Sequence, residues 1–217
     1  MDGVCGMKYE ILLADIGNTH FHIYNTKKVE HLTYEDAIKK YSQSKLCYIS
    51  VKHQLSDVIA GIKNWKNISS LMKIEGEYVT MGVDRKALCL SHQNGIFIDA
   101  GSAITVDIVK NGIYNGGYIF PGLKAMLKTY KEISPALENE LDSKINLHRL
   151  PFTTKEQISY GIIASIKALI EKHSESKILY FTGGDGKFLS TFFDDAVSDE
   201  TLVFRGILKV IKDKKIC

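Results

Sequence analysis

The chain contains one short pattern twice, and this repeat decides the fold. Ile11–Thr19 reads ILLADIGNT, and Gly95–Ala103 reads GIFIDAGSA. In both, a mainly apolar run leads into Asp-x-Gly and then Asn or Ser, which predicts a strand that ends in a tight turn before a second strand. Glycine allows a ligand to approach the backbone closely, and neighbouring N–H groups, hydroxyls and amides bind anionic oxygens. The repeat therefore predicts two half-sites for a polyphosphate, one in each half of the chain.

Composition places the chain among ordinary globular proteins. Of its 217 residues, 45% are hydrophobic and 24% are charged, with a formal net charge of +3. This near-neutral balance argues against nucleic-acid binding, and no run approaches the ~20 apolar residues of a membrane span. The four cysteines form no C-x-x-C pair, and the first residues lack the features of a secretory signal. We therefore predict a cytoplasmic protein with reduced cysteines and no membrane partner.

Apolar periodicity predicts that strands and helices alternate in both halves. In the first half we expect strands at Tyr9–Ala14, Phe21–Tyr24, Lys28–Leu32, Lys45–Val51 and Leu71–Ile74, and helices at Tyr34–Tyr41, Ser56–Trp65 and Arg85–Ser91. In the second half we expect strands at Ile96–Asp99, Ile104–Val109, Ile113–Ile119, Ile178–Thr182 and Leu202–Phe204, and helices at Leu123–Tyr130, Ile158–Lys172 and Ile207–Lys212. Each half thus begins with a three-stranded meander. The prediction is an α/β protein with two mixed sheets flanked by helices, divided at residues 8–92 and 93–217, with a cleft between the halves.

Four motifs in order make the chain similar to a known family. Asp15–Thr19, Gly82–Arg85 (GVDR), Asp99–Asp107 (DAGSAITVD) and Gly116–Gly122 (GGYIFPG) resemble those of type III pantothenate kinases, within the actin/hexokinase/Hsp70 ATPase superfamily. This resemblance implies a duplicated ribonuclease-H-like fold. It also implies ATP-dependent phosphorylation of pantothenate to 4′-phosphopantothenate, the first step of coenzyme A biosynthesis. The implied cofactors are Mg²⁺ with ATP and a monovalent cation, K⁺ or NH₄⁺, and the implied assembly is a homodimer.

The resemblance assigns the nucleotide site to both Asp-x-Gly turns. The implied ATP-binding residues are Asp15, Ile16, Gly17, Asn18, Thr19, His20, Phe21, His22 and Ser102, and Asp99 is the implied ligand of the monovalent cation. For Asp15 and Asp99 the competing interpretation is an ordinary turn residue at a strand end. The turn Gly183–Gly186 (GGDG) resembles the adenosine-binding turn of the superfamily, and it equally fits a plain strand-to-helix turn.

The implied acceptor site lies around the second motif. A carboxylate within reach of a primary alcohol can accept its proton during phosphoryl transfer, and the resemblance gives this role to Asp84. From the residues alone, Asp84 is better explained as a helix N-cap. The implied substrate-binding residues are Tyr78, Gly82, Val83, Asp84, Arg85 and Thr154. Arg85 could otherwise be a surface residue, and Thr154 a simple cap of the helix that follows it.

Other kinase and dinucleotide motifs are missing from the chain. It contains neither G-x-x-x-x-G-K-(S/T) nor G-x-G-x-x-G, which argues against a P-loop kinase and a Rossmann enzyme. Two alternatives stay open beside the pantothenate kinase. One is a non-catalytic family member with a regulatory or transcription accessory role, and the other is a different small-molecule kinase or ATPase of the same superfamily.

Overall fold

The computed structural model describes residues 11–17, 20–51, 56–175 and 177–216, and these fall into two compact units. One unit comprises the chain up to residue 91 together with residues 201 onward, and the other comprises residues 92–200. The predicted division at 92/93 lies one residue beyond the first boundary of these units, at 91/92. It differs at the C-terminus, because the last helix, α7 (Leu202–Lys214), groups with the first unit rather than with the second.

The first unit is built on a five-stranded mixed sheet. Its strands are β1 (Leu12–Ile16), β2 (Phe21–Tyr24), β3 (Val29–Leu32), β4 (Leu46–Ser50) and β5 (Trp65–Asn67), in the order β3-β2-β1-β4-β5. The first three strands form an antiparallel meander, whereas β4 is parallel to β1 and β5 is parallel to β4.

The second unit repeats this topology. Its strands are β6 (Gly95–Ala100), β7 (Ala103–Lys110), β8 (Ile113–Pro121), β9 (Leu179–Thr182) and β10 (Val197–Ser198), in the order β10-β9-β6-β7-β8. As in the first sheet, three strands form an antiparallel meander and two further strands are parallel. The predicted duplicated α/β fold is therefore confirmed, because each half of the repeat forms its own five-stranded sheet.

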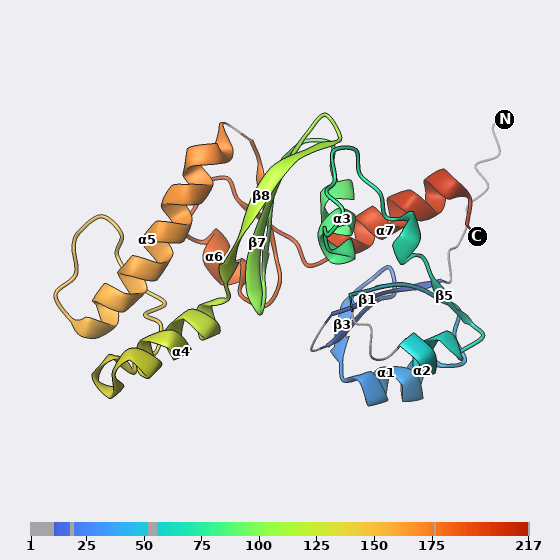
Figure 1. Cartoon of the computed structure of the whole chain (residues 1–217), viewed down its shortest axis with the longest axis horizontal. Helices are drawn as coiled ribbons and strands as arrows, with labels where there is room; N and C mark the ends of the chain where they lie inside the picture. Colours follow the sequence, from blue (N-terminus) through green and yellow to red (C-terminus); the bar gives the residue numbers. More distant parts are fainter. Residues whose placement is uncertain (1–10, 18–19, 52–55, 176, 217) are drawn as a thin grey trace. The chain divides into compact units, whose positions relative to one another are not determined.

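Helices cover both faces of the first sheet (Figure 1). The helices α1 (Tyr34–Tyr41) and α2 (Ser56–Ala60) share a core with Ile16 and Phe21 through Ala37 and Ile59. Side chains alternate along a strand, so Tyr24 projects from the opposite face, where its ring stacks on Phe204 of α7. On this second face α7 also packs closely on α3 (Val83–Leu90).

The crossing of α3 and α7 depends on one glycine. A Cβ atom at Gly206 would lie 1.8 Å from the carbonyl oxygen of Ala87, so no other residue fits there without separating the two helices. This contact explains why the C-terminal helix belongs to the first unit. It also gives α3, which carries Asp84, a fixed support.

Helices α4 (Leu123–Ile133), α5 (Thr154–Ser174) and α6 (Gly186–Ser190) cover one face of the second sheet (Figure 1). Their core includes Ile98, Val106, Phe181 and Ile163, all almost completely buried. The opposite face carries a stack of Phe97, Tyr180 and His92. Asp99 lies on this opposite face, because it is two residues from Phe97 along the same strand.

Three predicted elements were wrong. The helix expected at Ser56–Trp65 ends at Ala60, and Trp65 begins β5. No strand forms at 71–74; the short 3₁₀ helix η1 (Ser69–Leu71) ends there, and a second one, η2 (Pro135–Leu137), follows α4. The segment Leu202–Phe204 is the first turn of α7, because a short apolar run fits a buried helix as well as a strand.

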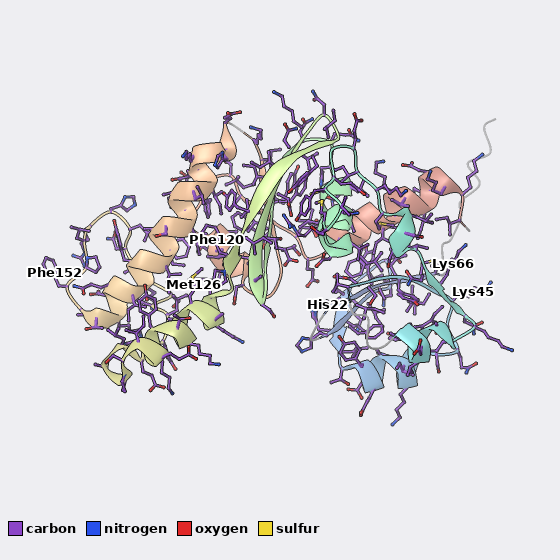
Figure 2. All side chains as sticks on the ribbon, in the orientation of Figure 1. His22, Lys45, Lys66, Phe120, Met126 and Phe152 are labelled. Carbon is purple, nitrogen blue, oxygen red and sulfur yellow. The ribbon has the colours of Figure 1, made fainter. Side chains whose placement is uncertain are left out.

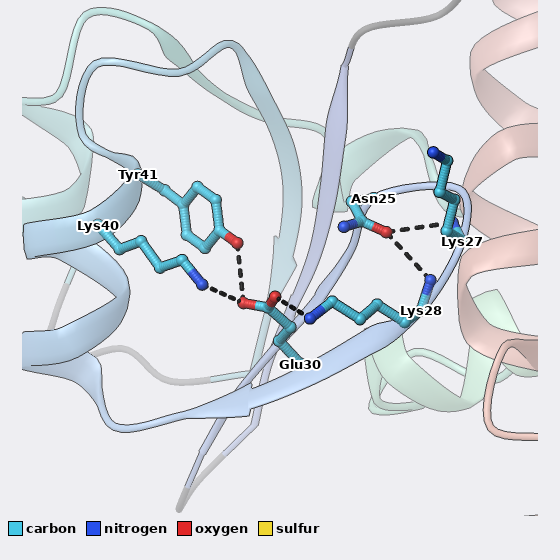
Figure 3. Close-up of polar contacts among 6 residues, drawn as sticks. All are labelled: Asn25, Lys27, Lys28, Glu30, Lys40 and Tyr41. Atoms are coloured by element: carbon cyan, nitrogen blue, oxygen red, sulfur yellow. Dashed lines mark hydrogen bonds and ion pairs between the residues drawn. The ribbon is translucent and has the colours of Figure 1, made fainter.

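Polar contacts hold the β2–β3 hairpin against α1 (Figure 3). The Asn25 side-chain oxygen accepts hydrogen bonds from the backbone N–H groups of Lys27 and Lys28, which closes the turn. Glu30 on β3 accepts hydrogen bonds from Lys40 and Tyr41 of α1 at 2.7 and 2.8 Å. The hydrogen bonds from Lys40, Lys28 and Tyr41 lower the pKa of Glu30 to about 2.

Candidate active site

The first Asp-x-Gly turn joins β1 to β2. The N–H group of Gly17 donates to the carbonyl oxygen of His20 at 3.1 Å, and the carbonyl oxygen of Gly17 accepts the hydroxyl of Tyr34 at 2.5 Å. Asp15 lies opposite His22 in the strand register. The predicted ATP-binding residues Asn18 and Thr19 lie outside the described residues.

Two of the other predicted ATP-binding residues belong to the core. The side chains of Ile16 and Phe21 are completely buried, and the Phe21 ring packs edge-on against Tyr34. They can offer only backbone groups to a ligand. His20 is exposed and His22 is partly buried, so among the described residues of this turn and its strands the polar side chains are Asp15 and these histidines.

Three histidines gather beside this turn. The Nδ1 atoms of His22 and His31 are 2.6 Å apart, so one ring donates and the other accepts. Burial first, and then the neighbouring His31 and His20, lower the pKa of His22 to about 4. His22 is therefore neutral at pH 7. Figure 2 labels His22 on the first sheet.

The second Asp-x-Gly turn has the same construction. The N–H group of Gly101 donates to the carbonyl oxygen of Ala103 at 2.9 Å, and Ser102 at the tip is exposed. The N–H group of Gly122, at the start of α4, donates to the carbonyl oxygen of Ser102 at 3.1 Å. A Cβ at Gly122 would lie 2.4 Å from the carbonyl oxygen of Gly101, so α4 begins directly against the turn.

A Cβ atom at the glycine of either turn would make only ordinary van der Waals contacts. A Cβ at Gly17 would lie 3.6 Å from its nearest neighbour, and one at Gly101 would lie 3.9 Å away. Neither glycine has the positive φ that excludes other residues. The fold itself therefore does not require glycine at either position, and close approach of a group such as a phosphate to the N–H groups is a reason for glycine there.

Asp99 lies in a setting that suits a hard cation. A Cβ at Gly183, which has φ +83°, would lie 2.4 Å from the Asp99 carboxylate and 2.6 Å from the carbonyl oxygen of Ala100. The Asp99 carboxylate and the Ala100 carbonyl oxygen thus approach the same point, and oxygens are the ligands that alkali and alkaline-earth ions require. No group of three or more His, Cys, Asp or Glu side chains suitable for a metal ion occurs among the described residues. An ion at Asp99 would therefore need further ligands from hydroxyls, carbonyls, water or phosphate.

The GVDR motif forms the start of α3, and the structure corrects two interpretations of it. Gly82 is the N-cap, whereas Asp84 lies in the first turn, where its Oδ1 atom accepts the N–H of Arg85 at 2.8 Å. Asp84 is thus not the N-cap. Arg85 is only 8% exposed, so it is not a surface residue. Its guanidinium donates to the Tyr78 hydroxyl at 2.5 Å and lies 5.8 Å from the centre of the Tyr78 ring.

An ion pair between Glu77 and Lys86 connects the segment that carries Tyr78 to the helix that carries Arg85. The Glu77 carboxylate accepts Lys86 Nζ at 2.9 Å and the backbone N–H of Ile74 at 2.8 Å. Burial raises the pKa of Glu77, but the hydrogen bonds from Lys86 and Ile74 outweigh it and lower the pKa overall. Glu77 and Lys86 are the sequence neighbours of Tyr78 and Arg85. This pair was not predicted, because nothing in the local sequence indicates that a residue before the helix would contact one inside it.

The sixth predicted substrate-binding residue belongs to the other unit. Thr154 is the first residue of α5, and Thr153 is the actual N-cap, since its hydroxyl accepts the N–H of Glu156. The interpretation of Thr154 as the cap was therefore wrong by one position. Thr154 is exposed, and its hydroxyl is available to a ligand.

A pocket of about 300 Å³ lies beside the Gly183–Gly186 turn. It is lined by Leu123, Lys124, Leu127, Leu141, Ser143, Asp185 and Phe188. The Asp185 N–H donates to the carbonyl oxygen of Ala100 at 2.9 Å, so this wall of the pocket is attached to the second Asp-x-Gly turn. An apolar hollow next to a phosphate-binding turn can accept a flat ring.

Comparison with known proteins decides the family. Residues 67–176 match the family model described as type III pantothenate kinase. A type III pantothenate kinase from Helicobacter hepaticus is 42% identical over 203 residues, covering 93% of this chain and 98% of the relative. One from Wolinella succinogenes is 38% identical over 206 residues, covering 94% and 98%. This chain belongs to the type III pantothenate kinase family.

Solved structures agree with this family and its fold. A crystal structure from Campylobacter jejuni, named a proposed Baf family transcriptional activator, is 37% identical with a TM-score of 0.86 and covers 95% of this chain and 100% of that one. A proposed 2-dehydro-3-deoxygalactonokinase from Sinorhizobium meliloti shares the fold at 11% identity, with a TM-score of 0.58 over 94% of this chain and 99% of that one. The predicted actin-like ATPase fold is thereby confirmed. As for membranes, none of the described helices has the length and apolarity to cross one.

Proposed function

We propose that this chain, as a type III pantothenate kinase, transfers the γ-phosphoryl group of ATP to the hydroxyl of pantothenate and forms 4′-phosphopantothenate, the first step of coenzyme A biosynthesis. The observation that supports this most directly is the start of α3. There a partly buried carboxylate, a buried guanidinium and a phenol come together within a few residues of a helix N-terminus. These groups suit an acceptor that carries both a hydroxyl and a carboxylate.

In this proposal Asp84 accepts the proton of the attacking hydroxyl. Its Oδ1 atom accepts the Arg85 N–H, which orients the carboxylate, and a carboxylate within hydrogen-bond reach of the hydroxyl can accept its proton. Arg85, with Tyr78 bonded to its guanidinium, binds the pantothenate carboxylate. Gly82 and Val83 supply backbone at the helix start, and the Thr154 hydroxyl contributes a further polar contact to the substrate.

Each Asp-x-Gly turn contributes to ATP binding. Backbone N–H groups and the Ser102 hydroxyl bind phosphate oxygens, and the pocket beside Gly183–Gly186 accepts the adenosine. Asp15 holds hydrated Mg²⁺, and Asp99 holds K⁺ or NH₄⁺. When bound, these ions supply positive charge where negative charge develops on the oxygens of the transferring phosphoryl group.

We further propose a homodimer formed through the second unit. Large apolar side chains are exposed there, notably Ile119 at 58%, Ile133 at 68% and Phe152 at 92%. A hollow of about 410 Å³ between β8, α4 and α5 is lined by Phe120 and Met126 among others, both labelled in Figure 2. Exposed apolar area of this kind favours a protein partner. Light scattering behind a sizing column measures the mass directly, and a monomer at micromolar concentration contradicts this part of the proposal.

The catalytic proposal is tested by ADP release from protein, MgATP and KCl, with and without pantothenate, together with mass spectrometry of the product. Acceptor-dependent ADP release and a phosphorylated pantothenate are expected. The variant Asp84→Asn should lose about 10²–10⁴ in kcat. Arg205→Gln, an exposed change on α7, is the matched control and should keep full activity. ATP hydrolysis that ignores pantothenate would point to another ATPase of the superfamily, and no turnover with any acceptor would favour a regulatory role.

A further inference from the structure

A row of side chains crosses the second sheet at Asp99. In the strand register Asp99 of β6 lies opposite Thr105 of β7 on one side and opposite Thr182 of β9 on the other. Directly paired residues on neighbouring strands project from the same face, with Cβ atoms roughly 5 Å apart. The Asp99 carboxylate therefore has a threonine on each side, on the face that does not carry α4 and α5.

The Thr105 hydroxyl is buried and has no hydrogen-bond partner in the part of the chain that the structure describes. Buried hydroxyls are normally bonded, so an unbonded one needs a specific explanation. The Tyr118 hydroxyl is also buried without a partner, and burial raises its pKa to about 12. Tyr118 pairs with Val106, however, and so projects into the core under the helices, away from Asp99. Of the two threonines that lie opposite Asp99, Thr105 is the one whose buried hydroxyl has no hydrogen-bond partner among the described residues.

A monovalent cation fits this pair of groups better than the other ligands of the site. A carboxylate beside a neutral hydroxyl oxygen offers one negative charge with uncharged ligands, which matches K⁺, and NH₄⁺ can donate hydrogen bonds to both oxygens. Mg²⁺ keeps most of its water and binds through carboxylates and phosphates. A phosphate oxygen would be repelled by Asp99.

We propose that the Thr105 hydroxyl is an oxygen ligand of the monovalent cation at Asp99. This inference rests on the proposed kinase function and extends it, since Thr105 was not among the predicted site residues. The site then contains a group whose hydrogen-bonding capacity is used only when the cation is bound. Consequently, the hydroxyl should be unfavourable for the stability of the cation-free protein and favourable for cation binding.

The test uses Thr105→Val, which removes the hydroxyl and keeps the β-branched shape that suits a strand. Thermal unfolding is followed in Mg²⁺ and a non-hydrolysable ATP analogue while KCl replaces choline chloride at constant ionic strength. In choline chloride, Thr105→Val should melt at or above the wild-type temperature. In this variant, the KCl concentrations that give half-maximal stabilisation and half-maximal activity should each rise about tenfold. This rise corresponds to a loss of about 1.4 kcal/mol in cation binding.

Two matched variants make the result specific. Tyr118→Phe also removes an unbonded buried hydroxyl. Its melting temperature in choline chloride should therefore also be at or above that of the wild type, but its KCl midpoint should be unchanged. Thr105→Ser keeps the hydroxyl and should keep a KCl midpoint near that of the wild type. Titrations of Mg²⁺ and of ATP on Thr105→Val should give unchanged midpoints.

The outcomes separate this inference from the proposed function. An unchanged KCl midpoint in Thr105→Val overturns the inference, as does a shift confined to the Mg²⁺ or ATP titration. A wild type that phosphorylates pantothenate but ignores KCl in both assays also overturns it, and leaves the kinase proposal standing. If pantothenate is not phosphorylated while KCl still stabilises the wild type and Thr105→Val shifts its midpoint, the kinase proposal fails and the cation ligand is supported.

Discussion

The two sheets share one topology and place an aspartate at the same point, yet the residues beside the two aspartates differ in chemistry. On the meander side, Asp15 is followed across the sheet by His22 and His31, whereas Asp99 is followed by Thr105 and Ile119. On the other side, Asp15 lies opposite Ile49 and Asp99 lies opposite Thr182. The first row contains titratable rings, and the second contains hydroxyls. The two halves thus share the Asp-x-Gly turn, while the side chains beside the aspartate differ in chemistry.

The aspartates themselves should show the largest contrast. Asp15→Asn and Asp99→Asn should each lower kcat/KM for pantothenate about 10³-fold, because both remove a charge that holds a cation at the phosphates. Only Asp99→Asn should abolish the response to KCl, and only Asp15→Asn should raise the Mg²⁺ requirement. Initial rates over a grid of KCl and MgCl₂ concentrations measure both effects. The same KCl response in the two variants would show that the rows do not differ in function.

The glycines give the next largest effect. Gly183→Ala should destabilise the protein by about 2 kcal/mol or more, since it forces a Cβ at φ +83° against Asp99 and the Ala100 carbonyl. Gly17→Ala and Gly101→Ala should change the unfolding free energy little and raise KM for ATP about tenfold, because the added methyl fills space left for a ligand. Urea denaturation and ATP titration distinguish the two classes. Equal stability losses for all three variants would contradict this view.

The histidine row should make the first sheet sensitive to acid. His22 has a pKa of about 4 in the folded protein and about 6.5 when unfolded, so the unfolded state binds more protons between these values. Its contribution to stability is present above pH 6.5 and is lost as the pH falls towards 4. Between pH 7 and pH 5 the loss should be at most about 2 kcal/mol.

Urea denaturation at the two pH values measures this loss, and His22→Gln should reduce it. The matched variant Thr105→Val, on the equivalent strand of the second sheet, should leave the pH dependence of the wild type unchanged. If His22→Gln loses as much stability at pH 5 as the wild type, the acid sensitivity does not come from this histidine.

The smallest effect is expected from the Glu30 contacts in Figure 3. Glu30→Gln should cost under about 1 kcal/mol, because its partners Lys28 and Lys40 are largely exposed. The pKa of Glu30 is lowered to about 2, so the contribution of this group is lost only in strong acid and not between pH 5 and 8. Thermal unfolding at pH 7 checks the value. A larger loss of stability in Glu30→Gln would mean that the contacts of Glu30 with α1 also hold His22 and His31 in place.

Local sequence determined the turns and most of the secondary-structure elements of this protein. The two Asp-x-Gly turns and the meander that each begins could be predicted because turns and strands are encoded in consecutive residues. The family followed from the order of the motifs. The short apolar run at Leu202–Phe204 could not be assigned correctly, since its period is compatible with both a strand and a helix.

Only the tertiary structure decided which side chains contact one another. Strand register placed Thr105 beside Asp99 and His31 beside His22, and the absence of a Cβ at Gly206 let α7 join the first unit. Packing also buried Arg85 against Tyr78. Of these contacts, that of Gly206 with Ala87 joins segments far apart in the chain. The others join adjacent strands of a meander or a loop and the helix after it, and their geometry depends on strand register and packing. Composition and spacing specify what each segment becomes, but only the packed sheets fix which oxygen lies next to which carboxylate.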